Sequence, residues 1–313
     1  MAETSIEWTE KVWNPVRGCS MVSVGCEQCY AMKTAHRFSG PGGTYEGLTE
    51  RGPKGPRWNG KIILAHAHLR DPLHWQTPRT IFVNSMSDLF HEDIPIEFLH
   101  QVFAVMALTQ QHTYQILTKR PERMHAMLTE QKPYENFWAL VEGHAQRIYA
   151  DLYPDEDQES GVMWPAVHGP LPNVWLGVSV ENQQAADARI RILLHTPTAV
   201  RWISAEPLLG PVDLSASLTI RAHPSPLDWV VVGGESGRGA RPCEVAWIRS
   251  IVQQCRATGV ACFVKQLGAK PIWTNPAAVS EYDEPWGDVR LEDKKGGAME
   301  EWPNDLQVRE WPT

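Results

Sequence analysis

The sequence lacks any long hydrophobic run. No apolar segment approaches the roughly 20 residues that a membrane-spanning helix requires. Residues 1–10 also lack the basic stretch followed by an apolar one that is typical of a secretory signal peptide. We therefore expect a soluble, cytoplasmic protein with no membrane partner.

Positive charge is scarce as well. The chain has 29 Lys and Arg against 37 Asp and Glu, a formal net charge of −8. Non-specific binding to nucleic acid depends on the neutralisation of phosphates by Lys and Arg. The net negative charge therefore argues against strong non-specific binding to nucleic acid. It does not exclude a local groove lined by basic residues.

Cysteine is too sparse for a disulfide scaffold, since 313 residues contain only six. Three of the six, Cys19, Cys26 and Cys29, fall within eleven residues in the pattern C-x6-C-x2-C. Thiolates in such a loop are typical ligands of zinc or of iron–sulfur clusters. The other three cysteines are isolated in the sequence, and they are Cys243, Cys255 and Cys262.

The two metal chemistries differ in how many ligands they need. A structural zinc site usually has a fourth Cys or His, and no second C-x2-C pair is present. His36, His66 or His68 could supply that ligand, but their spacing is not diagnostic. Three cysteines leave one iron of a [4Fe–4S] cluster open to a small molecule. Both readings remain open at this point.

Seven short apolar segments predict strands buried on both faces, because they lack strict alternation. Helical periodicity lies between them, at Ile96–Leu108, at Ala185–Leu194 after a predicted cap at Glu181-Asn182, and at Ala246–Thr258 before Gly259. The predicted strands are Lys61–Ala65, Thr80–Asn84, Tyr114–Leu117, Val174–Val178, Val200–Ile203, Trp229–Val232 and Ala261–Val264.

Strands that alternate with helices predict a parallel α/β sheet. With a weaker strand near Ile6–Val12 the count reaches eight, which favours a parallel (βα)8-type, TIM-like barrel, complete or partial. An open doubly wound sheet would want a Gly-rich phosphate loop after its first strand, and the sequence has none. We expect the barrel to span residues 1–270, with insertions at about 38–60 and 129–172. Residues 271–313 should form a tail packed on the barrel.

Polar clusters follow six of the predicted strands, and such strand ends converge at one face of a parallel barrel. Charged side chains come directly off these strands, where an ordinary turn would more often use Gly, Asn, Asp or Pro. The pattern predicts a shared binding site, and polar exits from the core are the simpler alternative. The charged residues are Lys119, Glu181, Glu206, Glu235 and Lys265.

Longer motifs around these residues resemble an uncharacterised family of phage and prophage proteins that is described as radical-S-adenosylmethionine-like and of three-Cys-motif type. A more distant similarity is to spore photoproduct lyase. The motifs are Trp13–Cys19, Gly25–Tyr30, Asn84–Phe90, Leu117–Pro121, Leu176–Asn182, Glu206–Gly210, Gly233–Ser236 and Phe263–Gly268.

The resemblance implies an enzyme that generates a deoxyadenosyl radical and repairs or modifies a nucleic acid or nucleotide, with an electron donor as partner. It implies that Cys19, Cys26 and Cys29 bind a [4Fe–4S] cluster. Lys119 and Ser179 would hold S-adenosylmethionine, in a cofactor site that also includes Thr118, Asn182 and Ser85. Glu181, Glu206, Glu235 and Lys265 are the candidate catalytic residues facing the substrate. Arg51, Lys54 and Arg57 could contact phosphates, or could form an ordinary solvated basic loop.

Two features of the sequence keep other functions open. The cysteine spacing is three residues longer than the usual C-x3-C-x2-C, and Gly233-Gly234-Glu235 follows a late strand instead of the second. A zinc- or cluster-stabilised phage binding or regulatory protein without catalysis is the main alternative. A metal-dependent hydrolase, with Asp88, His91 and His66 as ligands, is the third.

Overall fold

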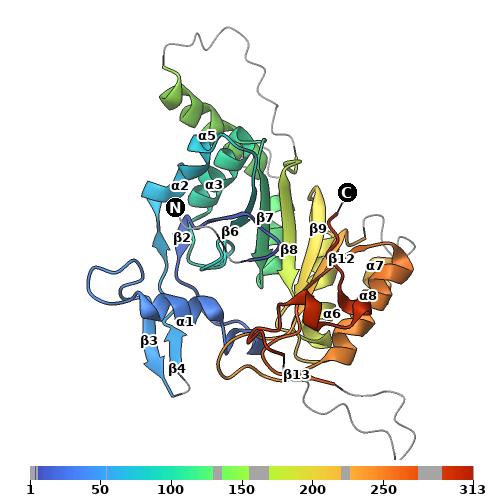
Figure 1. The fold of residues 1–313 in the computed structure, drawn as a ribbon. Helices are drawn as coiled ribbons and strands as arrows, with labels where there is room; N and C mark the ends of the chain where they lie inside the picture. Colours follow the sequence, from blue (N-terminus) through green and yellow to red (C-terminus); the bar gives the residue numbers. More distant parts are fainter. Residues whose placement is uncertain are drawn as a thin grey trace, which may run out of the picture. The chain divides into compact units, whose positions relative to one another are not determined.

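The described residues form a seven-stranded parallel sheet (Figure 1). The computed structural model describes residues 4, 6–53, 55–129, 136–154, 169–219, 226–273 and 291–312. The strands lie in the order β1-β6-β7-β8-β9-β10-β12. Their bounds are β1 Lys11–Trp13, β6 Thr80–Val83, β7 Thr113–Thr118, β8 Val174–Ser179, β9 Val200–Ala205, β10 Trp229–Gly233 and β12 Ala261–Gln266.

The strand order follows the chain without a reversal. A doubly wound sheet would reverse its order at a switch point, as mononucleotide-binding folds do. The α/β class and the parallel sheet are thereby confirmed. Among the described residues the sheet has seven strands instead of eight, which is compatible with a partial TIM-like barrel.

Six of the predicted strands lie in this sheet because their residues are apolar on both faces. Every residue of β10 is buried, and β8 exposes only Trp175 in part. The register places Val231 of β10 between Ser204 of β9 and Phe263 of β12. Both faces of these strands are therefore covered, as the apolar runs predicted.

The prediction for Lys61–Ala65 was wrong. Only Ile63–Leu64 forms a strand, β5, and it pairs antiparallel with β2 (Val16–Arg17), outside the parallel sheet. Ile63 stays 41% exposed, so this short run lacks the two-sided burial of a central strand. The weaker prediction near Ile6–Val12 corresponds to β1, which takes the place beside β6.

The predicted helices are confirmed with small shifts at their ends. Helix α3 spans Ile96–Leu108, α6 spans Gln183–Leu194 and α8 spans Val245–Thr258. Asn182 caps α6, since its Oδ1 accepts a hydrogen bond from the Ala185 N–H at 3.0 Å. Gly259 ends α8 at φ 74°, the left-handed conformation that glycine adopts readily.

The described chain divides into two compact units. Unit 1 comprises Met1–Met21, Ala31–Gly177 and His195–Ala199, and unit 2 comprises Val22–Tyr30, Val178–Leu194 and Val200–Thr313. The remaining helices of unit 1 are α1 Tyr30–Arg37, which begins at the last residue of a unit 2 segment, α2 His66–Leu69, α4 Pro121–Thr129 and α5 Phe137–Leu152. Unit 2 also holds α7 Ser215–Leu218 and a small pair of strands, β11 Cys243–Glu244 and β13 Pro271–Ile272.

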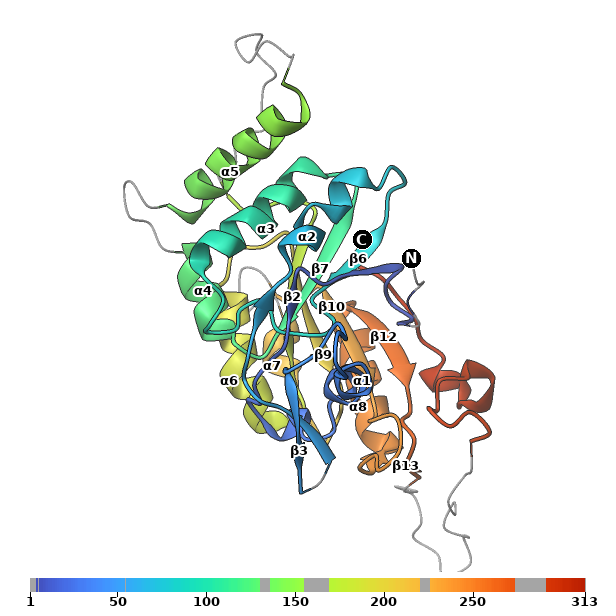
Figure 2. The same cartoon turned by 90° about the vertical axis from the view of Figure 1, so that its left-hand side faces the viewer.

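Both segments expected as insertions carry regular structure within unit 1. The first contains an antiparallel hairpin of β3 (Thr49–Gly52) and β4 (Gly55–Trp58). Arg51 and Arg57 lie on this hairpin, whereas Lys54 lies outside the described residues. The second contains α5, which packs along α3 (Figure 2).

The segment 306–310 covers the edge of the sheet in unit 2. The Val264 N–H donates to the Val308 carbonyl and the Glu310 N–H donates to the Cys262 carbonyl, each at 2.8 Å. Phe263 and Arg309 form an antiparallel bridge between these two bonds. The outer backbone of β12 is therefore paired.

None of the helices that the structure describes combines the length and apolar character needed to cross a bilayer.

Gly18 precedes Cys19 and should tolerate no side chain. Its φ is +91°, and a Cβ at this position would lie 2.1 Å from the Lys61 carbonyl oxygen. We expect Gly18→Ala to lower the free energy of unfolding by about 2 kcal/mol or more, because backbone strain and a clash with fixed backbone add together. Urea unfolding measures this.

Gly60→Ala is the matched control for Gly18. Gly60 has φ +85° but no heavy atom within 4 Å of its Cβ position. Its replacement should cost only the conformational term, about 1–2 kcal/mol. Equal losses in the two variants would contradict the proposed contact between Gly18 and Lys61.

Candidate metal and cofactor site

The polar segment after β6 holds the segment that leads to Cys19. The Ser85 hydroxyl donates to Asn14 Oδ1 at 3.2 Å, and the Ser87 hydroxyl donates to the Val16 carbonyl at 2.9 Å. Both side chains bind the chain a few residues before Cys19. The structure therefore gives Ser85, predicted as a cofactor ligand, a role in positioning the first cysteine segment of unit 1.

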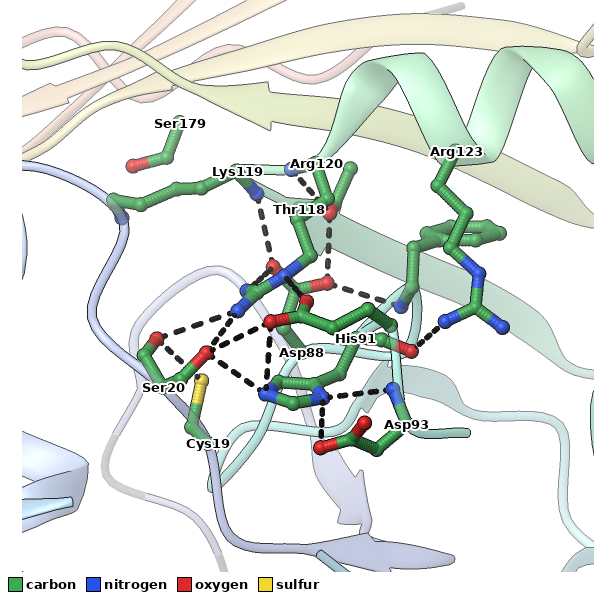
Figure 3. A network of polar contacts seen from close by, with 12 residues as sticks. Cys19, Ser20, Asp88, His91, Asp93, Thr118, Lys119, Arg120, Arg123 and Ser179 are labelled. Atoms are coloured by element: carbon green, nitrogen blue, oxygen red, sulfur yellow. Dashed lines mark hydrogen bonds and ion pairs between the residues drawn. The ribbon is translucent and has the colours of Figure 1, made fainter. Parts of the chain in front are cut away.

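Asp88 is the centre of a buried network at the ends of β6 and β7 (Figure 3). Its carboxylate accepts hydrogen bonds from Thr118 Oγ1 at 2.7 Å, from the Lys119 N–H at 3.1 Å and from Arg120 Nη1 at 3.0 Å. The Asp88 side chain is only 8% exposed. A buried carboxylate requires such partners. Thr118 is thus held by Asp88, and its hydroxyl also accepts from the Arg120 N–H.

Arg120 connects this network to the first cysteine. Its Nη2 donates to Ser20 Oγ at 2.6 Å and its Nε donates to Glu92 Oε2 at 2.7 Å. Cys19 lies close enough to interact electrostatically with the guanidinium. Although burial acts against it, the charges of Asp88 and the bonded Glu92 raise the pKa of Arg120 above its ordinary value. A permanent cation beside a cysteine favours the thiolate, which is the form that binds metals.

His91 and Glu92 flank this arginine with opposite ionisation preferences. Burial and the nearby Arg120 charge lower the pKa of His91, which is 1% exposed. Partial burial opposes ionisation of Glu92, but hydrogen bonds from its own backbone and from Arg120 lower its pKa to about 2. At neutral pH the network therefore holds a neutral imidazole beside an ionised carboxylate.

The other two cysteines lie on a clamped turn of unit 2. Cys26 ends a 3-10 turn at Val24–Cys26, and the Cys29 N–H donates to the Cys26 carbonyl at 3.2 Å. Arg241 Nη1 donates to the Val24 carbonyl at 2.8 Å, while its Nε and Nη2 bind the Glu235 carboxylate at 3.0 and 2.6 Å. Hydrogen bonding to Glu235 raises the pKa of Arg241 despite its partial burial. Glu235 thereby orients the arginine that holds the cysteine turn.

Glu181 also lies against this turn. Glu181 is 1% exposed and forms an ion pair with Arg189 at 2.7 Å. A Cβ on Gly25 would lie 3.2 Å from Glu181 Cδ, so a glycine allows the turn to approach this carboxylate closely. Arg189 also donates to the Ser179 carbonyl at 2.7 Å. Ser179 is itself buried, and its hydroxyl donates to the Glu206 carbonyl at 3.4 Å.

Glu206 and Lys265 form a more accessible pair in unit 2. Lys265 Nζ lies 2.8 and 2.9 Å from the two Glu206 oxygens, and the two side chains are 16% and 17% exposed. Gln266 Nε2 donates to the same carboxylate at 3.0 Å. A polar ligand could compete for this pair more readily than for Glu181 or Glu235.

The predicted site residues thus fall into two groups, one in each unit. In unit 1, Thr118 and Lys119 bind Asp88, and Ser85 binds Asn14. Arg120, which also binds Asp88, is the member of this group that lies near Cys19. Unit 2 brings the turn of Cys26 and Cys29 together with Glu181 and Glu235. Asn182 serves as the cap of α6.

Three arginines complete these groups, and the sequence analysis missed their roles. Arg120 directly follows Lys119, which the sequence analysis had named. Arg189 lies on a helix and Arg241 in a loop, and nothing in the sequence near either residue indicated a role in the site. Each pairs with a carboxylate at a strand end. Some of the charged strand-end residues that predicted a shared binding site are therefore paired with other residues of the protein.

The three clustered cysteines of the sequence are more exposed than the three isolated ones, as expected if only the first three bind a metal. Cys19, Cys26 and Cys29 are partly exposed, whereas Cys243, Cys255 and Cys262 are buried. Burial raises the pKa of Cys243 to about 12, so its thiol stays protonated. The first three cysteines fit a cluster or zinc in accessibility and in the short turn that joins Cys26 to Cys29, and the last three do not.

The structure does not assign these three thiols to one ligand group, since Cys19 belongs to unit 1 and the other two to unit 2. Among the described residues, one group of three potential metal ligands lies within mutual reach, and it consists of Glu97, His100 and His144. The ligand set considered for a hydrolase, Asp88, His91 and His66, does not form such a group in the described part of the chain.

A sequentially ordered parallel sheet with polar strand ends and two clamped cysteine segments defines a mixed α/β protein with a candidate metal-binding loop. The chain belongs to the DUF5131 family, a family of proteins of unknown function, whose model matches residues 3–298. No curated protein and no solved structure matches the chain.

His91 makes stability depend on pH in one direction. Its Nδ1 accepts from the Asp93 N–H at 3.2 Å and its Nε2 lies 2.8 Å from Ser20 Oγ, so protonation would break the first contact. Its folded pKa lies below the ordinary 6.5. The unfolded chain therefore binds the proton more readily, and stability present above about pH 6.5 is lost as the pH falls below it.

Urea unfolding at about pH 7.5 and about pH 5 tests this dependence. His91→Asn should be less stable than wild type at the higher pH, by about 1–2 kcal/mol, and should lose less stability on acidification. His74→Asn, at an exposed histidine, should keep the wild-type difference. A His91→Asn protein with the full wild-type acid sensitivity would contradict the assignment.

Arg241 should restrain the cysteine turn. Arg241→Lys keeps the positive charge but removes the forked contacts to Glu235 and Val24. We expect iodoacetamide to alkylate Cys26 of the metal-free variant faster by roughly a factor of five, equivalent to about 1 kcal/mol of lost restraint. Peptide mass spectrometry measures the rate.

The matched control is Arg249→Lys. It removes another arginine–carboxylate pair of unit 2, with Asp305 at 2.6 Å, and contacts no part of the turn. Its Cys26 should react at the wild-type rate. Equal acceleration in both variants would show that general loosening, and not the Arg241 clamp, exposes Cys26.

Proposed function

We propose that this protein is an iron–sulfur enzyme of the radical S-adenosylmethionine type. Cys19, Cys26 and Cys29 hold a [4Fe–4S] cluster, whose fourth iron is open to S-adenosylmethionine. When bound, this pair supplies one-electron cleavage of the sulfonium and a deoxyadenosyl radical. The proposal takes its ligand set from the C-x6-C-x2-C spacing and from the family resemblance.

The observation that carries the proposal is the way the cysteine segments are held. Arg241 and Glu235 clamp the turn that bears Cys26, and the Asp88–Arg120 network lies beside Cys19. Ligands on restrained segments favour metal binding because less conformational entropy is lost on binding. The other three cysteines, Cys243, Cys255 and Cys262, are buried.

The chain's own residues have separate roles in this proposal. Arg120 and Arg241 place positive charge near the cysteine segments, which favours thiolates. Lys119 binds the carboxylate of S-adenosylmethionine, and Ser179 is the second residue that we assign to this cofactor, as the family resemblance implies. Glu181 and Glu235 are positioning residues for the turn at Val24–Cys26.

Glu206 and Lys265 are the residues that we assign to the substrate. They are the accessible pair among the charged strand ends, so a substrate group can exchange with either partner. The proposed substrate class is a nucleic acid or nucleotide, as the family resemblance implies, and a base in a duplex would have to be flipped out to react. An electron donor is required as a partner to reduce the cluster.

A binding or regulatory protein without catalysis is the second candidate. The observation that favours it is the mutual pairing of the strand-end charges, because Glu181–Arg189 and Glu235–Arg241 need no ligand to offset their burial. In that function zinc would take the place of the cluster. The metal that is lost when Cys26 is replaced decides between the two candidates.

Anaerobic purification followed by iron, sulfide and zinc analysis tests the proposal. Wild type should contain about four iron and four sulfide per chain, with broad visible absorption. Cys26→Ala should lose most of both, because one of three ligands is missing. Cys255→Ala, at a buried cysteine, should keep the cluster.

With dithionite and S-adenosylmethionine, the wild type should form 5′-deoxyadenosine and Cys26→Ala should form none. A colourless protein whose zinc disappears in Cys26→Ala would establish the zinc-stabilised alternative. An intact cluster without deoxyadenosine would refute the radical chemistry while leaving the cluster in place.

A further inference from the structure

Helices α3 and α5 of unit 1 bring three potential metal ligands together. Glu97 and His100 lie three residues apart on α3, so both side chains project from the same face. His144 projects from α5, which packs along α3 (Figure 2). One ligand atom from each of the three lies within 4.8 Å of the others.

The individual distances suit a shared ion. His144 Nε2 lies 2.8 Å from Glu97 Oε1, and His100 Nδ1 lies 3.8 Å from Glu97 Oε2. Two ligands bound to one tetrahedral zinc ion lie about 3.3 Å apart, because zinc–nitrogen and zinc–oxygen bonds are about 2.0–2.1 Å long. The two separations involve different oxygens of Glu97 and bracket that value, so small side-chain rotations would bring one ligand atom of each residue to it.

His100 provides an independent sign of a missing partner. It is 2% exposed, and neither of its ring nitrogens has a hydrogen-bond partner in the described part of the chain. A buried polar group without a partner is costly, and nearly all such groups in folded proteins are satisfied.

We propose that Glu97, His100 and His144 form a zinc site that joins α3 to α5 and leaves a fourth coordination position open to solvent. Two imidazoles and one carboxylate are a ligand set that divalent zinc accepts. The side chain of Glu97 is 61% exposed while both histidines are buried, so water can reach the ion from the glutamate side. Three protein ligands with an accessible fourth position are typical of sites where zinc exchanges or activates water.

Ordinary packing explains these residues less well. The Glu97–His144 contact needs no metal, and the rings of His100 and Phe137 pack edge to face at 4.9 Å. Neither contact supplies a partner for the His100 nitrogens. A metal bound at Nδ1 satisfies one of them and explains why two histidines and a carboxylate meet inside a helix pair that is otherwise rich in Phe and Trp.

This site is independent of the proposed cysteine-bound cluster. The ligands are nitrogen and oxygen atoms instead of thiolates, and all three belong to unit 1. Failure of either proposal leaves the other untouched. Zinc found in the purified protein must therefore be assigned to one site or the other by substitution.

Metal titration of the full chain, stripped with a chelator, tests the site. Wild type should bind one Zn²⁺ here, and Glu97→Gln should weaken that binding about tenfold or more. Glu97 is exposed, so this variant should fold normally. His144→Ala should lose the site, whereas His74→Ala, at an exposed histidine that no proposed site uses, should bind as wild type does.

Two further readouts separate this site from the cysteines. Co²⁺ in the wild type should give visible bands from nitrogen and oxygen ligands that disappear in Glu97→Gln and persist in Cys26→Ala. Zn²⁺ should raise the thermal midpoint of His74→Ala more than that of Glu97→Gln. The proposal is overturned if Glu97→Gln and His144→Ala bind the same number of zinc ions, with the same affinity, as His74→Ala.

Discussion

The arrangement of this protein depends on the pairing of carboxylates at strand ends with arginines. Asp88, Glu181 and Glu235 are all buried, and an unpaired buried carboxylate would be driven to take up a proton. Arg120, Arg189 and Arg241 pair with these carboxylates at contacts of 2.6 to 3.0 Å. Two of these arginines also reach chain segments that carry cysteines. A single interaction type thereby fixes both the polar ends of the strands and the segments that they support.

The extent to which the sequence determines this structure varies with the range of the interaction. Periodicity predicted both ends of α3 to the residue, and the Glu181-Asn182 pair before α6 predicted the cap that Asn182 forms. Helices and caps are predictable in this way because they depend on neighbours in the chain. Buried apolar runs predicted six strands of the sheet. The same rule failed at Lys61–Ala65, where the run is apolar but only Ile63–Leu64 forms a strand, on the small sheet with β2.

Long-range partners could not be read from the sequence. Arg241 and Val24 are 217 residues apart, and nothing in the composition of either segment indicates their contact. His100 and His144 are a comparable case, since only the fold of α3 against α5 brings them together. The i, i+3 spacing of Glu97 and His100 was the one local signal, and it occurs on many helices without a metal. The sequence thus predicted several of the charged residues of the site, but only the three-dimensional structure revealed which residues they contact.

The paired edge of β12 has a consequence for how the protein behaves outside its native state. An open strand edge is a template for pairing with another chain, and β12 is apolar at Cys262, Phe263 and Val264. Residues 308–310 occupy that template. Proteolytic removal of this short segment would expose the unpaired N–H and C=O groups of β12. Aggregation of the cleaved protein would therefore begin at this edge, while the rest of unit 2 was still folded.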